Sequence, residues 1–117
     1  MEEKAIHLAL DLIRVTNQFP RPEGERLKKE IRALAILLPG RITAGRVKGD
    51  SRAFLTDLHR AVDTLSRIEL QILVSTEMGF LDRSDFFRLE QRILGMRQLG
   101  RGWYRGLLSR LRKERGP

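Results

Sequence analysis

Apolar residues alternate at spacings of three and four along most of the second half of the chain. One run takes steps of 4, 3, 4, 3 and 4 and consists of Phe54, Leu58, Ala61, Leu65, Ile68 and Ile72. The next takes steps of 3, 4, 3, 4, 3 and 4 and consists of Phe86, Leu89, Ile93, Met96, Gly100, Trp103 and Leu107. This heptad spacing lines one face of a long helix. Two such helices, each roughly 40 Å long at ~1.5 Å per residue, predict an all-α protein.

Helix-breaking and helix-capping residues divide the chain into four helical segments. Pro20 and Pro22 end the first helix. Asp50 or Ser51 is placed to cap the third helix, and Gly79 is placed to end it. The predicted helices cover residues 3–17, 23–46, 51–78 and 82–112. Because short connections make neighbouring helices antiparallel, the predicted fold is a single-domain, up-down-up-down four-helix bundle over residues 1–117.

Several residues carry more detailed expectations about packing. Pro39 is expected to kink the second helix without necessarily ending it. The wide apolar face of the third helix predicts that it is covered on two sides. Trp103 is in register with the apolar run and is expected in the core. The fourth helix contains four interior glycines, each costing about 1 kcal/mol relative to alanine. Close packing is the favoured explanation for them, and loosened last turns are the alternative: Gly95, Gly100, Gly102 and Gly106.

The positive charge is concentrated in the last third of the chain. The chain has 23 Lys and Arg against 15 Asp and Glu, a net charge of +8. From Arg83 onward there are ten basic and three acidic residues, so 10 − 3 = +7. Residues 1–82 carry thirteen basic and twelve acidic residues, so 13 − 12 = +1. This asymmetry predicts a polyanionic partner for the last third.

Composition also argues against several protein classes. Without cysteine, the chain has neither disulfides nor thiolate metal ligands. Its acidic first residues do not resemble a signal peptide, and no run of eighteen apolar residues is present. We therefore expect a cytoplasmic protein without a membrane partner.

No pattern of catalytic residues emerges from the sequence. His7 and His59 lie on different predicted helices, and there is no Glu-x-x-His, Walker or Gly-x-Gly-x-x-Gly motif. His59 is expected at a solvent edge or an interface. Glu69 borders the apolar run, where an ion pair with an arginine of a neighbouring helix or subunit is expected more than acid–base chemistry. We predict no catalytic residue, no metal site, no cofactor and no enzymatic activity.

Arginines form stripes that share helix faces. Arg97, Arg101 and Arg105 are four apart, and no acidic residue lies four positions from them, so we expect these charges to be free. A phosphate-binding surface is the functional interpretation and an ordinary solvated face is the alternative. Trp103 and Tyr104 lie among these arginines, and stacking on an unpaired base is an alternative to packing for both. Packing is favoured for Trp103, whereas Tyr104 is open to either role. The candidate nucleic-acid-binding residues are Arg60, Arg67, Arg88, Arg92, Arg97, Arg101, Arg105, Arg112 and Lys113.

Several short segments along nearly the whole chain match one known pattern. They are Phe19-Pro20, Glu23, Leu27, Ile31-Arg32-Ala33, Pro39, Gly45 and the segment 54–81, which includes Ala61, Glu69, Ile72 and Gly79-Phe80-Leu81. In these positions the sequence resembles a four-helix-bundle family that includes proteins encoded in intervening sequences of large-subunit ribosomal RNA genes and Avd, the accessory variability determinant of diversity-generating retroelements. Segment 99–104, Leu-Gly-Arg-Gly-Trp-Tyr followed by a basic tail, is similar to the Avd branch. Arg41 and Ala44 replace the Asn and Glu that the wider family often has, which also favours Avd.

The resemblance implies a specific assembly and role. Avd proteins form homopentameric barrels, bind the retroelement's reverse transcriptase and its template RNA, and support mutagenic copying. The same nine basic residues then become candidates for contact with reverse transcriptase, RNA or DNA. Five copies would carry 5 × 8 = +40 formal charges. The alternative is a homo-oligomeric structural adaptor of the same family that has no direct role with nucleic acid.

Overall fold

The computed structural model describes residues 1–115 and shows an all-helical chain. Its four helices are α1 (Glu2–Thr16), α2 (Glu25–Val47), α3 (Ser51–Glu77) and α4 (Arg83–Arg115). The predicted segments are confirmed, and no predicted end differs from the observed one by more than three residues. The largest difference is at the end of α4, which continues to Arg115.

Side chains cap the start of both long helices of the second half. The Asp50 carboxylate accepts a hydrogen bond from the Arg52 N–H at 3.1 Å, which confirms Asp50 as the cap of α3. The Asp82 carboxylate accepts hydrogen bonds from the Asp85 N–H and the Ser84 hydroxyl, both at 2.8 Å. These hydrogen bonds, the Asp85 N–H first, lower the pKa of Asp82 because they stabilise its charged form.

Gly79 ends α3, as its position in the sequence predicts. Its φ of +81° lies in the left-handed region, which glycine enters without steric cost. The chain then folds back so that the N–H groups of Phe80 and Leu81 donate to the Ser75 carbonyl at 2.9 and 3.3 Å. Phe80 packs against the buried Phe19 with ring centroids 5.9 Å apart, which closes this end of the bundle.

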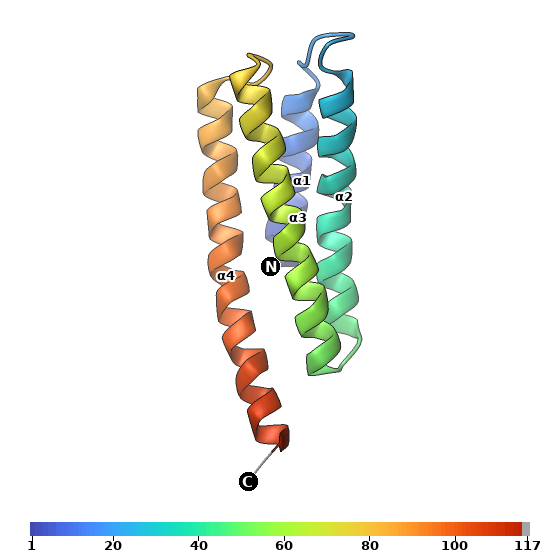
Figure 1. The fold of residues 1–117 in the computed structure, drawn as a ribbon, viewed down its shortest axis with the longest axis vertical. Coiled ribbons are helices and arrows are strands. Elements are labelled where there is room, and N and C mark those ends of the chain that lie inside the picture. Colours follow the sequence, from blue (N-terminus) through green and yellow to red (C-terminus); the bar gives the residue numbers. More distant parts are fainter. Residues whose placement is uncertain (116–117) are drawn as a thin grey trace.

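The helices form a ring in which each contacts its two neighbours. Within residues 1–115, α1 packs on α2 and α4, α3 packs on α2 and α4, and the backbones of the two diagonal pairs do not come close to each other. Successive helices are antiparallel, which confirms the up-down-up-down bundle (Figure 1). With 15 residues, α1 is the shortest helix and covers only the half near the α3–α4 turn, whereas the end of α4 projects past the α2–α3 turn.

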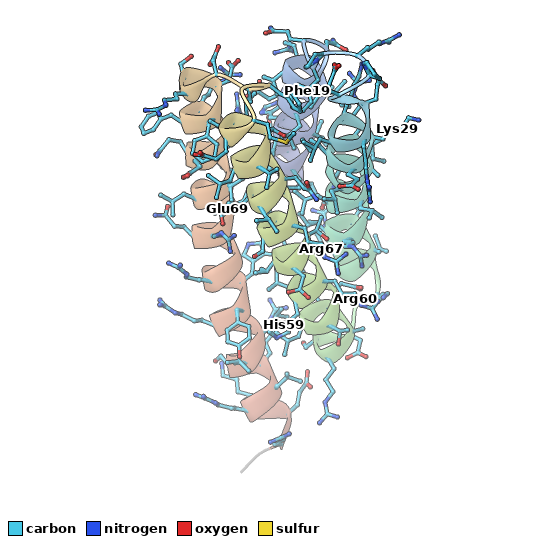
Figure 2. All side chains as sticks on the ribbon, turned by 45° about the horizontal axis from the view of Figure 1, so that its top comes forward. Phe19, Lys29, His59, Arg60, Arg67 and Glu69 are labelled. Atoms are coloured by element: carbon cyan, nitrogen blue, oxygen red, sulfur yellow. The ribbon has the colours of Figure 1, made fainter. Side chains whose placement is uncertain are left out.

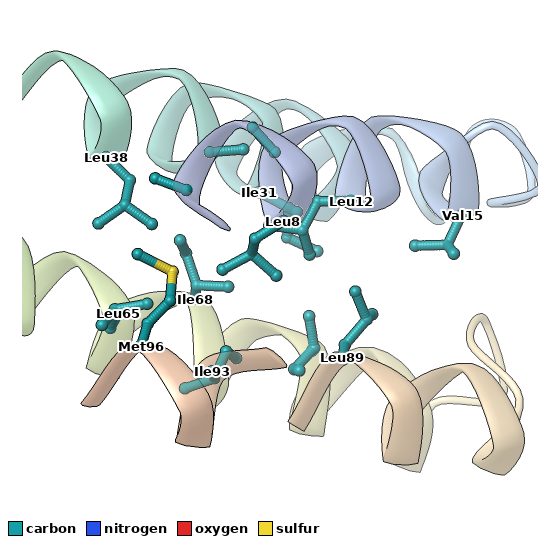
Figure 3. Close-up of a cluster of buried hydrophobic side chains, with 14 of the residues drawn as sticks. Leu8, Leu12, Val15, Ile31, Leu38, Leu65, Ile68, Leu89, Ile93 and Met96 are labelled. Atoms are coloured by element: carbon teal, nitrogen blue, oxygen red, sulfur yellow. The ribbon is translucent and has the colours of Figure 1, made fainter. Parts of the chain in front are cut away.

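The core follows the predicted apolar runs. Every helix contributes fully buried side chains, and these meet between the two helix pairs (Figure 3). Burying each of these side chains contributes about 1.5–3 kcal/mol. The largest are Leu8, Leu12, Ile31, Leu38, Leu65, Ile68, Ile72, Leu89, Ile93 and Met96. Trp103 is only partly buried, at the edge of this core, where it meets Phe54 edge-to-face at 5.3 Å.

The explanation of the α4 glycines by close packing is wrong for three of the four within this chain. Only Gly100 has neighbours, since a Cβ added there would lie 3.7 Å from the Met1 Cε. Gly95, Gly102 and Gly106 face open space. The close approach occurs instead at Gly45 of α2, where an added Cβ would lie 2.9 Å from the Asp57 Cβ on α3.

Two further expectations are met in part. α2 continues through Pro39 without ending. The wide apolar face of α3 is not fully covered by this chain, because Leu70 and Leu73 remain 59% and 43% exposed. None of the helices in residues 1–115 has the length and apolar character that crossing a membrane requires.

Candidate nucleic-acid and partner interface

The nine basic residues selected from the sequence lie in separate groups around the bundle. At about 100° per residue, Arg88 and Arg92 fall on the flank of α4 next to α1, and Arg97 falls on the flank next to α3. Arg60 and Arg67 lie on the side of α3 toward α2, whereas His59 and Glu69 lie toward α4 (Figure 2). The structure therefore divides the candidates into groups with different surroundings.

Arg88 and Arg92 are held by a carboxylate that the sequence analysis missed. Arg88 binds both oxygens of Asp11 through its Nε at 3.0 Å and its Nη2 at 2.8 Å, and Arg92 Nε donates to the same carboxylate at 3.1 Å. Arg88 also pairs with Asp85 at 2.7 Å. These two candidate residues do not carry free charges, because the neutralising carboxylate belongs to α1. Its sequence signal was an acidic residue between Leu8 and Leu12 on an apolar face.

Electrostatics around Asp11 fit a structural ion pair. The hydrogen bond from Arg88 lowers the pKa of the Asp11 carboxyl, and this outweighs its burial, which acts in the opposite direction. The same hydrogen bond raises the pKa of the Arg88 guanidinium. Both groups therefore stay charged near neutral pH, and each stabilises the other.

Arg97 is also committed to a contact between helices. Its Nη2 donates to Glu69 at 3.0 Å and to Ser66 at 3.2 Å, both on α3. This confirms the ion pair expected for Glu69, and it shows that Arg97 is not a free charge. The predicted stripe thus begins with a residue that holds α3 and α4 together.

The arginines of α3 have mixed surroundings. The buried Asp57 carboxylate pairs with Lys48 at 2.6 Å and, more loosely, with Arg60 at 3.8 Å. Arg67 is exposed and forms no ion pair within residues 1–115. Arg67 is therefore the freer of the two charges.

The end of α4 carries the densest group of free positive charge, and we call residues 101–115 the distal segment. It contains six basic residues and Glu114, so its net charge is 6 − 1 = +5. All six are exposed, and none forms an ion pair within the described part of the chain. Two of them, Arg110 and Arg115, were not among the predicted candidates. The six are Arg101, Arg105, Arg110, Arg112, Lys113 and Arg115.

A cavity of about 490 Å³ lies where the distal segment passes the α2–α3 turn, and we call it the bundle-end cavity. It is present because α1 is too short to occupy this end of the bundle. Phe54 and Trp103 form its apolar wall, Gly102 and Gly106 leave it open, and Arg110 stands at its rim. Sequence reasoning missed it because the limits of the helices do not reveal which residues of α2, α3 and α4 face one another at this end of the bundle.

Exposed apolar side chains gather between α1 and α2. Arg32 of α2 donates to the Ile13 carbonyl of α1 at 3.0 Å. One turn farther along the antiparallel pair, Leu10 and Ile36 lie at the same level. Leu10 is 51% exposed and Ile36 is 65% exposed, and Ile6 extends the group by another turn. We call Ile6, Leu10 and Ile36 the α1–α2 face.

A second exposed apolar group lies between α3 and α4. One turn from the Glu69–Arg97 ion pair, toward the α3–α4 turn, are Leu73 and Leu94. Phe87 is seven residues before Leu94, on the same side of α4, and is 65% exposed. We call Leu70, Leu73, Phe87 and Leu94 the α3–α4 face. Because α1–α2 and α3–α4 are opposite edges of the ring of helices, the two faces point in opposite directions.

Neither histidine belongs to a set of metal ligands. In residues 1–115 no three side chains of the His, Cys, Asp or Glu type are grouped so that they could hold a metal ion. His59 is exposed, as expected for a solvent-edge residue, and packs against Tyr104 with ring centroids 5.5 Å apart. A search of known family models finds no match to this chain, and a search of curated proteins finds none either.

Proposed function

We propose that this protein is an Avd-like accessory protein of a diversity-generating retroelement. It binds the retroelement's reverse transcriptase together with template RNA or cDNA and supports mutagenic retrohoming. The observation that carries the proposal is the distal segment, where six exposed basic residues have no ion-pair partner within residues 1–115. The contact with reverse transcriptase rests on the resemblance of segment 99–104 to Avd.

Free arginines on one helix are suited to a phosphate backbone. Each guanidinium that neutralises a phosphate releases a condensed counterion, so affinity falls steeply as salt rises. Arg101, Arg105 and Arg112 lie within an arc of about 40° around α4, so one strand is able to follow them. Arg67 is too far around the bundle to join this row. The distal segment therefore forms the main contact, and it distinguishes one base sequence from another only weakly.

The paired arginines have a different role. Arg88, Arg92 and Arg97 each donate hydrogen bonds to carboxylates of α1 or α3. Breaking these contacts to bind phosphate would leave the buried Asp11 without a partner, which is costly. Their role is to hold α4 against the bundle, and they contribute little to nucleic-acid binding.

The oligomeric assembly belongs to the same proposal. The α1–α2 and α3–α4 faces are apolar, exposed and opposite, so the first face of one copy is able to contact the second face of the next. Contacts of this head-to-tail kind close into a ring when the rotation between copies allows it. The resemblance to Avd supports five copies, which would present five distal segments on one particle.

The test is charge reversal of the distal segment. Replacing Arg101, Arg105, Arg112 and Lys113 by Glu changes the net charge by 4 × −2 = −8, from +8 to 0. We expect the fold to persist because these side chains are exposed. RNA binding, measured by fluorescence anisotropy over a salt series, should be abolished at physiological salt, since nonspecific affinity comes almost entirely from phosphate contacts.

A matched control separates this surface from net charge. Replacing Lys4, Arg14, Arg21 and Lys29 by Glu makes the same change of −8 on exposed residues of α1, the α1–α2 connection and α2. We expect the RNA affinity of this variant to remain steeply dependent on salt, because its distal segment is unchanged. Equal loss of binding in both variants would show that only net charge matters. An unchanged salt slope in the distal variant would rule out the assignment.

The second candidate function is a structural homo-oligomer without a nucleic-acid role, and the two apolar faces favour it. It predicts a particle of several subunits that does not bind RNA, cDNA or reverse transcriptase. Light scattering combined with the same anisotropy measurement and with co-purification on tagged reverse transcriptase distinguishes the two functions. An assembled particle that binds neither RNA nor reverse transcriptase supports the second candidate.

A further inference from the structure

A small cavity opens between α3 and α4 on the other side of the Glu69–Arg97 ion pair from the α3–α4 face, and we call it the Tyr104 cavity. Its volume is about 200 Å³. Pockets that enclose drug-sized ligands have volumes of about 300–1,000 Å³. The Tyr104 cavity is therefore of a size for one small planar group and not for a whole nucleotide.

Aromatic side chains form the outer wall of this cavity. Tyr104 is 37% exposed, and its ring meets the His59 ring edge-to-face, at an interplanar angle of 75° and a centroid distance of 5.5 Å. In this arrangement the edge of one ring meets the face of the other, and the contact restricts the orientation of the tyrosine. A ring held in this way is a preorganised surface for a second planar group.

The floor of the cavity is apolar. Leu58 and Val62 of α3 line it together with Gly100 of α4. A Cβ on Gly100 would lie 4.0 Å from both of these side chains, so the missing methyl group leaves the floor open without any steric requirement for glycine. Desolvating a planar base on this floor is favourable because its faces are apolar.

Positive charge lies at the rim. Arg101 lines the cavity, is exposed and forms no ion pair within residues 1–115. Arg97 also lines the cavity, but its guanidinium donates hydrogen bonds to Glu69 and Ser66. These bonds hold the side chain in place, so it forms part of the cavity wall. Arg105 follows Arg101 by one turn. A base in the cavity would thus have its phosphate beside Arg101 and the next phosphate toward Arg105.

We propose that Tyr104 stacks on one unpaired base of a single-stranded nucleic acid while Arg101 binds the adjacent phosphate. This inference rests on the proposed function and adds to it a requirement for single-stranded regions. Bases in a duplex are stacked on each other and do not present a free face, whereas an aromatic side chain accepts any unpaired base. The Tyr104 cavity therefore selects strandedness and not sequence.

The experiment compares two oligonucleotides that have equal numbers of phosphates. One is oligothymidylate and the other is abasic throughout, and an oligouridylate arm tests RNA. The wild-type protein should bind oligothymidylate and oligouridylate about tenfold more tightly than the abasic strand. Tyr104→Ala should remove this difference and leave abasic binding and the salt slope unchanged.

Two matched variants identify stacking as the cause. Tyr104→Phe keeps the ring and should retain the preference, whereas Tyr104→Leu keeps apolar bulk without a ring and should lose most of it. Arg101→Gln should weaken binding to all strands by a similar factor. Photocross-linking to bromouracil-substituted oligonucleotide, mapped by mass spectrometry, should identify the peptide containing Tyr104.

The outcomes separate this inference from the proposed function. Equal, salt-dependent binding of thymidylate and abasic strands would overturn the stacking role and leave the basic surface intact. A base preference that survives in Tyr104→Ala would place the base elsewhere and also overturn it. A wild-type protein that binds neither strand would remove both the inference and the proposed nucleic-acid role. Loss of reverse-transcriptase binding alone in Tyr104→Ala would assign the cavity to a protein partner.

Discussion

The Arg88 guanidinium of α4 binds the Asp11 carboxylate of α1 with two parallel hydrogen bonds, at 2.8 and 3.0 Å. Asp11 is only 4% exposed, whereas the side chain of Arg88 is 45% exposed. A bidentate arrangement fixes both the distance and the orientation of the two groups. This contact therefore sets how the shortest helix sits against the longest one.

Replacing Asp11 by Asn should destabilise the fold by about 2 kcal/mol at neutral pH, because a buried acceptor of charged hydrogen bonds is lost. The pKa of Asp11 is lowered in the folded state. Its stabilisation is therefore complete above the unfolded pKa of about 3.9 and is lost as the pH falls through the lower folded value. Urea unfolding at neutral and acid pH should show a smaller acid loss for the variant than for wild type. Equal acid losses would contradict this.

The double substitution of Arg88 and Arg92 by Gln should separate stability from binding. We expect a lower Tm, because Asp11 stays buried without a cationic partner. At a temperature where the variant is fully folded, its affinity for RNA should stay within about twofold of wild type, since these arginines are not free to contact phosphate. Anisotropy measured beside a circular dichroism melt checks both statements. A large loss of affinity in the folded variant would place these residues in the interface.

Replacing Gly102 and Gly106 by Ala should stabilise the protein by about 1 kcal/mol per site, because nothing lies within 4 Å of an added Cβ and alanine favours helix. Gly45→Ala is the matched control. Its Cβ would lie 2.9 Å from the Asp57 Cβ, so it should destabilise by about 1–3 kcal/mol. Thermal melts of the three single variants test the contrast. A lower Tm for Gly102→Ala would indicate that another subunit packs on this surface.

Substitutions on the two apolar faces should reveal how copies associate. Ile36→Glu and Phe87→Glu are each expected to give folded monomers, because the two side chains are exposed in the single chain. In a head-to-tail assembly, an equimolar mixture of the two variants retains one intact pair of faces and should form a heterodimer. Light scattering of each variant and of the mixture gives the answer. If either variant dimerises by itself, the contact is made between identical faces instead.

Much of the fold follows from sequence because helix periodicity is a local property. The heptad positions of α3 and α4 are buried with few exceptions, and Asp50 and Gly79 act as the cap and stop that their chemistry predicts. These features depend on spacing and on backbone conformation within a few residues. They can therefore be predicted from the sequence without knowledge of the neighbouring helices.

Partners between helices were not predictable in the same way. The sequence led us to expect an ion pair for Glu69, but it did not identify Arg97 as the partner. It also gave no indication that Asp11 pairs with Arg88 and Arg92, some 80 residues later in the chain. Likewise, helix propensity alone does not tell an open glycine such as Gly106 from a close contact such as Gly45. Such distinctions depend on which helices are neighbours and on which residues of the two helices lie at the same level along the bundle axis.

Sequence alone therefore determined the number of helices, their limits and the concentration of positive charge in the last third, because these depend on composition and local spacing. Only the tertiary structure decided which of those charges are free. Packing α4 between α1 and α3 neutralises its first arginines against Asp11 and Glu69. The distal segment keeps its charge because α1 is too short to reach it and α4 projects past the bundle end.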